Sequence, residues 1–166
     1  MMSSVRPGAL AAMAVFLAAA SPVHAQKAVV LVRHAEKVDE SNDPLLSTAG
    51  LARAQTLARH LRTAGVKAIY VTQYKRTALT AAPLALAAGL KPIVLRADGG
   101  QELVDRLRRD HADDVVLVVG HSDSVPETLG LLGHTEPVTI ASAEYDNLFV
   151  VVPGKGGPPM VLRLRY

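Results

Sequence analysis

Short apolar runs alternate with longer helix-forming segments along most of this chain. The runs rich in Val, Ile and Leu, which are typical of buried strands, lie at residues 29–32, 66–72, 91–95 and 114–119. The segments that predict helices lie between and after them, at residues 49–64, 76–88, 101–111 and 125–132. This alternation predicts an α/β fold, a three-layer sandwich in which helices cover both faces of a mostly parallel central sheet.

Local signals refine this outline. Ser47 or Thr48 can cap the first helix. Pro83 lies inside the second helix and should kink or divide it. Towards the end of the chain, two further strands at 147–152 and 160–164 flank a turn rich in Pro and Gly, which predicts a hairpin at the edge of the sheet.

The first 25 residues have the pattern of a secretory signal peptide. Arg6 supplies a positive start, residues 9–20 form an apolar run, and small residues before Gln26 offer a cleavage site after Ala25. The run is too short to span a membrane comfortably, so we expect cleavage rather than a retained anchor. The mature chain, residues 26–166, would be a single domain that is periplasmic or secreted and not stably inserted in the membrane.

Composition narrows the classes of function. The 166 residues include 18 basic and 15 acidic ones, and losing Arg6 with the signal peptide leaves 17 against 15, a net charge of +2. The basic residues are spread out and no aromatic residues interleave with them, so we expect no nucleic-acid partner. The absence of cysteine excludes disulfides, thiolate metal sites and a cysteine nucleophile, and suits an exported bacterial protein.

Cationic and imidazole side chains follow three of the predicted strands. Arg33 and His34 come directly after the first strand, Arg76 lies shortly after the second, and His121 follows residues 114–119. In a parallel sheet these exits share one edge, where ligands bind. Two arginines with two histidines suit a phosphoryl group, because guanidinium forks match its oxygens and a neutral imidazole can attack phosphorus. Gly120, before His121, would let the backbone approach a ligand closely.

Three motifs in this order resemble those of the histidine phosphatase superfamily, which has a phosphoglycerate-mutase-like fold. They are Arg33-His34-Ala35-Glu36, Arg76-Thr77 followed by Thr80-Ala81, and Val119-Gly120-His121-Ser122. The resemblance covers most of the mature chain and includes the helix start Leu46-Ser47-Thr48-Ala49-Gly50 and the strand Ala68-Ile69-Tyr70-Val71-Thr72. It implies that His34 is the phosphorylated nucleophile. Arg33, Arg76 and His121 would complete the phosphate pocket, with Ser122 beside them, and no metal or organic cofactor is implied.

The proton donor to the leaving group is open between three carboxyl groups. Larger members of the family carry a glutamate some way after the second arginine, and Glu102 lies at a comparable distance. Asp123, two residues past His121, is a rival, and Glu36 is a third candidate. The insertion that forms a lid in larger relatives is missing here. By resemblance, a small lidless member has a shallow site that suits exposed phosphates on proteins or large glycans.

The expected activity is metal-independent hydrolysis of phosphomonoesters or phosphoramidates through a phosphohistidine on His34. The substrate could be a phosphorylated small molecule, a glycan or a protein. A non-catalytic phosphate-binding or phospholigand-binding protein with the same pocket is the alternative. A metal hydrolase would use His34, Glu36, His121 and Asp123 as ligands, but two arginines in the same shell would repel the ion.

Overall fold

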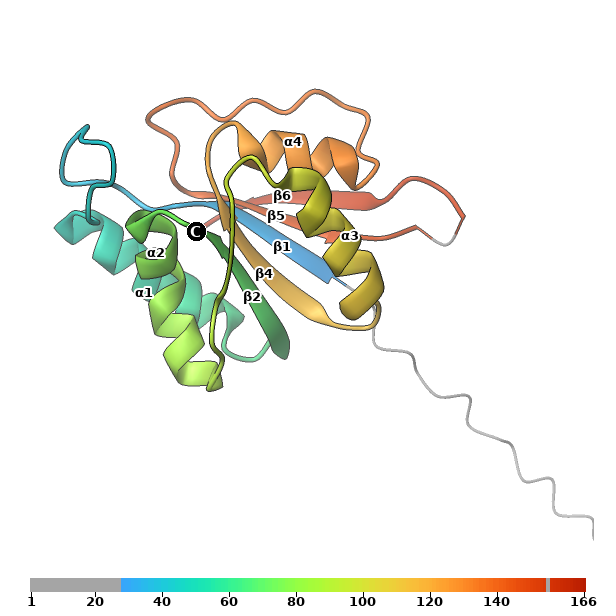
Figure 1. Cartoon of the computed structure of the whole chain (residues 1–166), viewed down its shortest axis with the longest axis horizontal. Helices are drawn as coiled ribbons and strands as arrows, with labels where there is room; N and C mark the ends of the chain where they lie inside the picture. Colours follow the sequence, from blue (N-terminus) through green and yellow to red (C-terminus); the bar gives the residue numbers. More distant parts are fainter. Residues whose placement is uncertain (1–27, 155) are drawn as a thin grey trace, which may run out of the picture.

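Six strands form one sheet in this computed structural model, which describes residues 28–154 and 156–166. They are β1 (Ala28–Arg33), β2 (Val66–Thr72), β3 (Ile93–Leu95), β4 (Val115–Gly120), β5 (Asn147–Val152) and β6 (Met160–Arg165). The strand order is β3-β2-β4-β1-β5-β6, with parallel pairing from β3 to β1 and antiparallel pairing of β5 with both neighbours (Figure 1). The predicted mostly parallel sheet is confirmed, and the predicted signal peptide, residues 1–25, lies outside the described residues.

Helices cover both faces of this sheet, as the sequence predicts. They are α1 (Thr48–Leu61), α2 (Lys75–Ala88), α3 (Gly100–Asp110) and α4 (Ser124–Leu131). The helices α1 and α2 pack together on one face, and α3 and α4 pack together on the other (Figure 1). Along β1, Val30 and Val32 face the first helix pair while Val29 and Leu31 face the second. Burial on both faces explains why the strands are unbroken apolar runs instead of alternating ones.

The helix α2 contains Pro83, where the sequence predicts a kink or a division. The helix is not divided there and continues to Gly89, which ends it in the left-handed conformation with a φ of 65°. Pro83 removes one amide donor, to the carbonyl of Leu79. The nearby residues Ala81 and Leu84 are buried against the sheet. Burial of this apolar face outweighs the missing hydrogen bond, because tertiary packing supplies most of a helix's stability.

The hairpin and one shortened strand complete the sheet. Strands β5 and β6 pair in antiparallel register from Asn147 with Arg165 to Val152 with Met160, and β6 lies at the edge, as predicted. The strand expected at 91–95 is shorter and begins at Ile93. Pro92, just before it, has no amide hydrogen to donate to a neighbouring strand.

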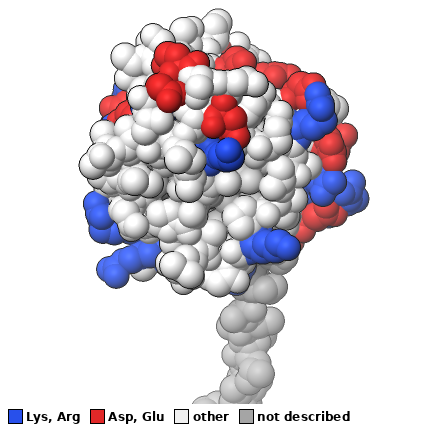
Figure 2. Space-filling view, turned by 60° about the vertical axis from the view of Figure 1, so that its left-hand side comes forward, with Lys and Arg blue, Asp and Glu red and all other residues white. Residues whose placement is uncertain are grey.

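Charged side chains of both signs are interspersed among uncharged ones on the face shown in Figure 2. Exposed ion pairs of the molecule include Arg96 with Asp98 and Arg106 with Glu102. Within residues 28–154 and 156–166, none of the helices combines the length and the apolar character that crossing a membrane would need.

Candidate active site

The two histidines predicted to act together are adjacent because their strands are adjacent. Strands β1 and β4 run parallel in the centre of the sheet, with Arg33 opposite Gly120. One step further, the backbone N–H of His34 donates to the carbonyl of Gly120 at 2.9 Å. The rings of His34 and His121 lie 5.4 Å apart, centroid to centroid, at 63° to each other. The register of two central strands therefore sets the distance between these imidazoles.

A cavity of about 320 Å³ opens at this edge of the sheet. Its lining residues are Arg33, His34, Lys37, Tyr74, Arg76, Ala97, His121, Ser122 and Asp123. The structure thus brings together the residues proposed from sequence for phosphate binding, together with one of the three candidate acids. Strand β1, the start of α2 and the segment between β4 and α4 each contribute, as expected of a parallel sheet.

The ring of His34 is oriented by the backbone. Its Nδ1 lies 2.8 Å from the carbonyl oxygen of Ala35, and since a carbonyl can only accept, Nδ1 carries the proton. The Nε2 atom therefore keeps its lone pair. Burial lowers the pKa of His34 to about 3; the bond to Ala35 opposes this, and His121, Arg33 and Arg76 add to the lowering. His34 is thus a neutral imidazole with a free Nε2, which is the nucleophilic form.

His121 is held between α2 and the end of β2. Its Nε2 lies 3.0 Å from the hydroxyl of Thr72, and its Nδ1 lies 3.5 Å from a guanidinium nitrogen of Arg76. Because a guanidinium only donates, Nδ1 is the acceptor and Nε2 carries the proton in this state. Burial lowers the pKa of His121 to about 4, the two arginines add to this effect, and Asp123 opposes it. His121 is therefore also uncharged near neutral pH.

Arg33 is fixed by the chain segment that leads into β5. One of its terminal nitrogens donates to the carbonyl oxygens of Ala141, Ser142 and Glu144, at 2.9, 2.9 and 3.1 Å. The guanidinium also stacks on Tyr145, 4.1 Å from the ring centroid. Its Nε is buried and has no partner among the described residues, and the residue lines the cavity.

Arg76 has a matching but looser arrangement. Its guanidinium lies 4.2 Å from the ring centroid of Tyr74, and one nitrogen donates to the carbonyl of Asn42 at 3.4 Å. The Nε of Arg76, like that of Arg33, is buried without a partner in the part of the chain that the structure describes. Two arginines, each backed by a tyrosine and each with an unused donor, form a site for a multiply charged oxyanion.

Supporting contacts explain parts of the motifs that carry no chemistry themselves. The Thr80 hydroxyl accepts from the backbone N–H of Ala35 at 3.0 Å and donates to the carbonyl of Arg76 at 2.7 Å, joining two motifs. A Cβ atom on Gly50 would overlap the carbonyl oxygen of Glu36, so glycine admits α1 against the loop that follows His34.

The role expected for Gly120 is different in the structure. A Cβ there would meet the hydroxyl of Ser124 at 2.8 Å and Val125 at 3.2 Å. Gly120 therefore makes room for the first turn of α4, and close approach to a ligand is not what its geometry shows.

The three candidate acids have three different environments. Glu102 lies on the exposed side of α3, pairs with Arg106 at 2.7 Å and does not line the cavity. Glu36 is bound by Arg53 at 2.7 Å; burial alone would raise its pKa, but the bonds from Arg53 outweigh burial and lower it. Asp123 lines the cavity, and one of its oxygens accepts from the N–H of Ser124 at 2.7 Å. The structure therefore does not bring Glu102 to the site, because its helix turns that position outward.

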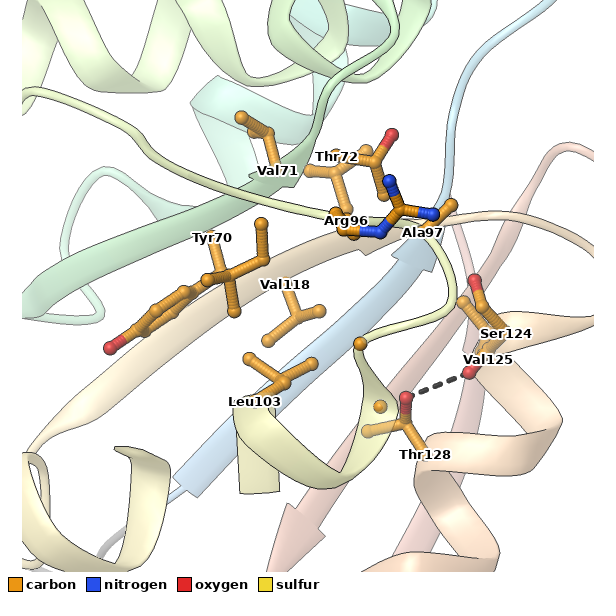
Figure 3. A pocket seen from close by; sticks show the side chains of 15 residues that line it. Tyr70, Val71, Thr72, Arg96, Ala97, Leu103, Val118, Ser124, Val125 and Thr128 are labelled. Carbon is orange, nitrogen blue, oxygen red and sulfur yellow. Dashed lines mark hydrogen bonds between the residues drawn. The ribbon is translucent and has the colours of Figure 1, made fainter. Parts of the chain in front are cut away.

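A second, narrower pocket lies beside the cavity, between β2, β4 and the first turns of α3 and α4 (Figure 3). Its volume of about 30 Å³ is room for roughly one water molecule. Thr128 donates to the carbonyl of Ser124 at 2.7 Å, and the Ser124 hydroxyl accepts from the N–H of His121 at 2.9 Å. Gly100 of α3 lines this pocket, whereas Glu102 does not. The pocket's wall thus supports the backbone of His121.

Sequence reasoning missed several residues that shape the site. Tyr74 and Tyr145 each stack on an arginine, and Thr72 holds His121. Tyr145 follows the cavity's main motifs by more than twenty positions, in a loop without periodicity, so no local pattern marks it. Tyr74 stands two residues before Arg76, at the start of α2, and this proximity was the one available signal.

The same geometry does not suit a metal ion. In residues 28–154 and 156–166, no group of three or more His, Asp or Glu side chains is placed to hold a metal ion. Glu36, one of the four hypothetical ligands, is turned to Arg53 instead. The arrangement of arginines and imidazoles thus fits an anion.

A parallel α/β sheet with this set of side chains at its carboxyl edge defines a class of phosphate-handling proteins, and comparison with known proteins agrees. Residues 29–98 match the model of the histidine phosphatase superfamily (branch 1). The matched part, which carries Arg33, His34 and Arg76, is thus similar to this superfamily. A search of curated proteins finds no significant match.

Solved structures share the fold over nearly their whole length. The protein histidine phosphatase SixA complexed with tungstate is 18% identical, with a TM-score of 0.67, over 83% of this chain and 96% of that one. Mycobacterial glucosyl-3-phosphoglycerate phosphatase is 15% identical, with a TM-score of 0.65, over 84% and 97%. A phosphoserine phosphatase from Entamoeba histolytica, in complex with 3-phosphoglyceric acid, is 14% identical, with a TM-score of 0.65, over 84% and 97%.

Proposed function

We propose that this protein is a phosphatase that works through a phosphohistidine on Nε2 of His34. One observation carries the proposal. His34 is a buried, neutral imidazole whose Nδ1–H is tied to the Ala35 carbonyl, and it lies in a cavity with two arginines that each have an unpaired buried Nε. This combination supplies a nucleophile and an oxyanion receptor at one place.

The reaction would proceed in two displacements. In the first, Nε2 of His34 forms a bond to phosphorus while the bond from phosphorus to the substrate's oxygen or nitrogen breaks, and the leaving atom takes a proton. In the second, a water oxygen attacks phosphorus, the bond to Nε2 breaks, and the water's proton passes to a base. Inorganic phosphate leaves and neutral His34 is restored. Arg33 and Arg76 stabilise the charge on the equatorial oxygens in both steps, and His121 in the same cavity can join them once its Nε2–H is released from Thr72.

Asp123 is the proton carrier that this geometry supports. It is the one carboxylate among the residues that line the cavity, whereas Glu36 is bound by Arg53 and Glu102 lies outside the cavity. Asp123 is exposed, however, and one of its oxygens already caps α4. Among the described residues that line the cavity, there is therefore no buried carboxylic acid poised to protonate a poor leaving group.

The nature of this proton carrier bears on the substrate. An alkoxide leaving from a phosphomonoester needs a proton in the transition state, whereas the nitrogen of a phosphoramidate can be protonated before the bond breaks. An exposed Asp123 is sufficient for the second case. Phosphoramidates such as phosphohistidine are thus favoured over alkyl phosphates, and the likeness to a protein histidine phosphatase supports this order. Phosphorylated small molecules and glycans remain within the class.

Export to the periplasm, or secretion, belongs to the same proposal. Its support is the pattern of the first 25 residues, with Arg6 ahead of an apolar run and a cleavage site after Ala25, and the absence of cysteine from the chain. Intact mass and N-terminal sequencing of the protein from a periplasmic extract test it. A mature chain that begins at Gln26 is expected, and an uncleaved chain in the cytosol would contradict it.

Trapping of the intermediate tests the enzymatic proposal. The full chain is mixed with a generic aryl phosphate, quenched without acid and mapped by mass spectrometry. Phosphate on His34 that appears and decays with turnover is expected. His34→Asn should show neither adduct nor turnover, and His60→Asn, at an exposed position on α1, should show both. Tight phosphate binding without an adduct or turnover would favour a non-catalytic phosphate-binding protein.

A further inference from the structure

We propose that Lys37 forms a subsite for a second anionic group, so that the preferred substrates carry a carboxylate or another phosphate near the phosphoryl group. This inference rests on the proposed phosphatase activity and adds the substrate class. Lys37 stands three residues after His34 and lines the same cavity as Arg33 and Arg76. Nothing in the two displacements on phosphorus requires a third cation.

The surroundings of Lys37 are unusual for a surface lysine. Its side chain is only 16% exposed, yet among the described residues its ammonium donates to the carboxylate of Glu40, at 2.6 Å. The side chain of Glu40 is itself 88% exposed. A lysine whose stem is covered usually directs its charge to water or to a firm partner. Here the partner is a solvated side chain that gains little from the pair and can be displaced.

The backbone around Lys37 is fixed, so the ammonium is presented from a defined point. Lys37 forms an isolated antiparallel bridge with Leu46, and the N–H of Val38 donates to the carbonyl of Leu45 at 3.1 Å. Further along the same loop, Asp43 accepts from the N–H of Lys75 at 2.8 Å. The loop is thereby tied both to itself and to the start of α2, which carries Arg76.

The charges that line the cavity point to the same substrate class. Arg33 and Arg76 provide two positive charges, which match the two negative charges of a phosphoryl group. Lys37 adds a third positive charge, and Asp123 is the one carboxylate in the lining. Asp123 already accepts from the backbone of Ser124, so it is not positioned as a dedicated partner of Lys37. A second anionic group on the substrate would pair with Lys37, whose present partner Glu40 is a solvated side chain.

A matched pair of substrates tests the subsite. Phosphoglycolate carries a carboxylate beside its phosphate, and 2-hydroxyethyl phosphate is its neutral counterpart. Lys37→Met should lower kcat/KM for phosphoglycolate by about tenfold, mainly through KM, which is the scale of one charge-assisted hydrogen bond. The same variant should change kcat/KM for 2-hydroxyethyl phosphate, and the Kd of inorganic phosphate, by no more than about twofold. Lys37→Arg should restore the preference.

Two further variants make the test specific. Lys75→Met removes a lysine that is 66% exposed and pairs with Asp43 outside the cavity, so it should leave both substrates unchanged. Glu40→Gln removes the competing carboxylate, so it should lower KM for phosphoglycolate and leave 2-hydroxyethyl phosphate unaffected. If the ion pair between Lys37 and Glu40 only stabilised the fold, Glu40→Gln would not lower the KM for phosphoglycolate.

The outcomes separate the subsite from the phosphatase proposal. If Lys37→Met lowered kcat/KM equally for both substrates, or weakened the binding of inorganic phosphate, Lys37 would be a ligand of the phosphoryl group itself. Either result would overturn the inference. No change in Lys37→Met would overturn it as well. If the unmodified protein turns over neither of these alkyl phosphates, its turnover of the aryl phosphate decides separately on the phosphatase proposal. Calorimetric titration with phosphoglycolate and with phosphate then tests the subsite. The subsite requires that Lys37→Met weaken the binding of phosphoglycolate and leave the binding of phosphate unchanged.

Discussion

His34 and His121 are uncharged because the fold buries them next to two arginines, which lowers their pKa values to about 3 and about 4. Free imidazole has a pKa near 6.5, so an exposed histidine would lose part of its nucleophilic form in mildly acidic surroundings. Here burial keeps the neutral form available over the whole range from neutral pH down to the folded pKa values. The nucleophilic form of His34 is therefore retained in mildly acidic surroundings.

Burial of neutral histidines should make stability depend on pH. Between about pH 6.5 and 3, the unfolded chain binds protons at these imidazoles that the folded chain does not, so stability falls as the pH falls through this window. At about pH 5 the loss is about 2 kcal/mol for each histidine. Urea unfolding at about pH 7.5 and 5 should show that His34→Gln loses about 2 kcal/mol less than the unmodified chain. Identical losses would mean that His34 titrates normally in the folded state.

The fork geometry of Arg76 should matter more than its charge. Arg76→Lys keeps the positive charge but loses the planar donors, the stacking on Tyr74 and the contact with His121. We expect vanadate or phosphate to bind about 1.5–3 kcal/mol more weakly, measured by inhibition of turnover or by calorimetry. Lys75→Arg, at the adjacent exposed position, is the control and should bind as before. Equal affinity in Arg76→Lys would place Arg76 outside the anion site.

At the scale of elements, the sequence carries most of the fold. The apolar runs of β1, β2 and β4 are long and two-sided, and each of them was located within a residue or two. The residues that follow these strands, Arg33, His34, Arg76 and His121, are then expected at one edge of the sheet. The carboxyl ends of parallel strands all lie at that edge. Helix boundaries followed from capping residues such as Ser47, whose side chain accepts from Gly50.

What the sequence did not reveal depends on long-range contacts. The carbonyls that hold Arg33 come from residues about 110 positions away, in a segment without regular structure. Whether Glu102 faces the site or the solvent depends on the rotation of α3 against the sheet, which spacing along the chain does not define. The continuity of α2 through Pro83 depends on how firmly its other face is buried. Each of these is a tertiary outcome with no local signature.

The close approach of α1 to the loop after His34 yields a prediction at this scale. Gly50→Ala would place a methyl group on the carbonyl of Glu36, which itself accepts from the N–H of Ser47 at 2.9 Å. We expect a loss of about 1–3 kcal/mol in the free energy of unfolding and a drop in kcat as the loop shifts. Gly130→Ala, in α4, is the matched control, because nothing lies within 4 Å of the added atom. It should be neutral or stabilising.

At the scale of the whole molecule, the two ends of the sheet differ: one end borders the cavity and the other is remote from it. Strands β1, β2 and β4 deliver their last residues to the cavity, whereas β5 runs the other way and carries its last residues to the opposite end. The turn between β5 and β6 is therefore remote from the cavity, and the segment 141–144 is next to it.

This polarity predicts where the chain tolerates insertion. A short Gly/Ser insertion at 156–157, in the exposed turn between β5 and β6, should leave kcat/KM within about twofold. The same insertion at 142–143 should abolish most activity, because it displaces the carbonyls that bind Arg33. Steady-state kinetics with an aryl phosphate measures both, and circular dichroism confirms that each variant folds. Comparable losses at the two sites would contradict this division.

The hydrogen bond between the backbone N–H of His34 and the carbonyl of Gly120 has a consequence for how this scaffold can change over time. The two imidazoles are set by main-chain atoms of neighbouring strands, which any sequence with the same strand register preserves. The loop that carries Lys37 and Asp43 can therefore be replaced or lengthened while the reacting pair stays in position. New substrate ranges can be acquired by exchanging one surface segment, with little need to rediscover the catalytic arrangement.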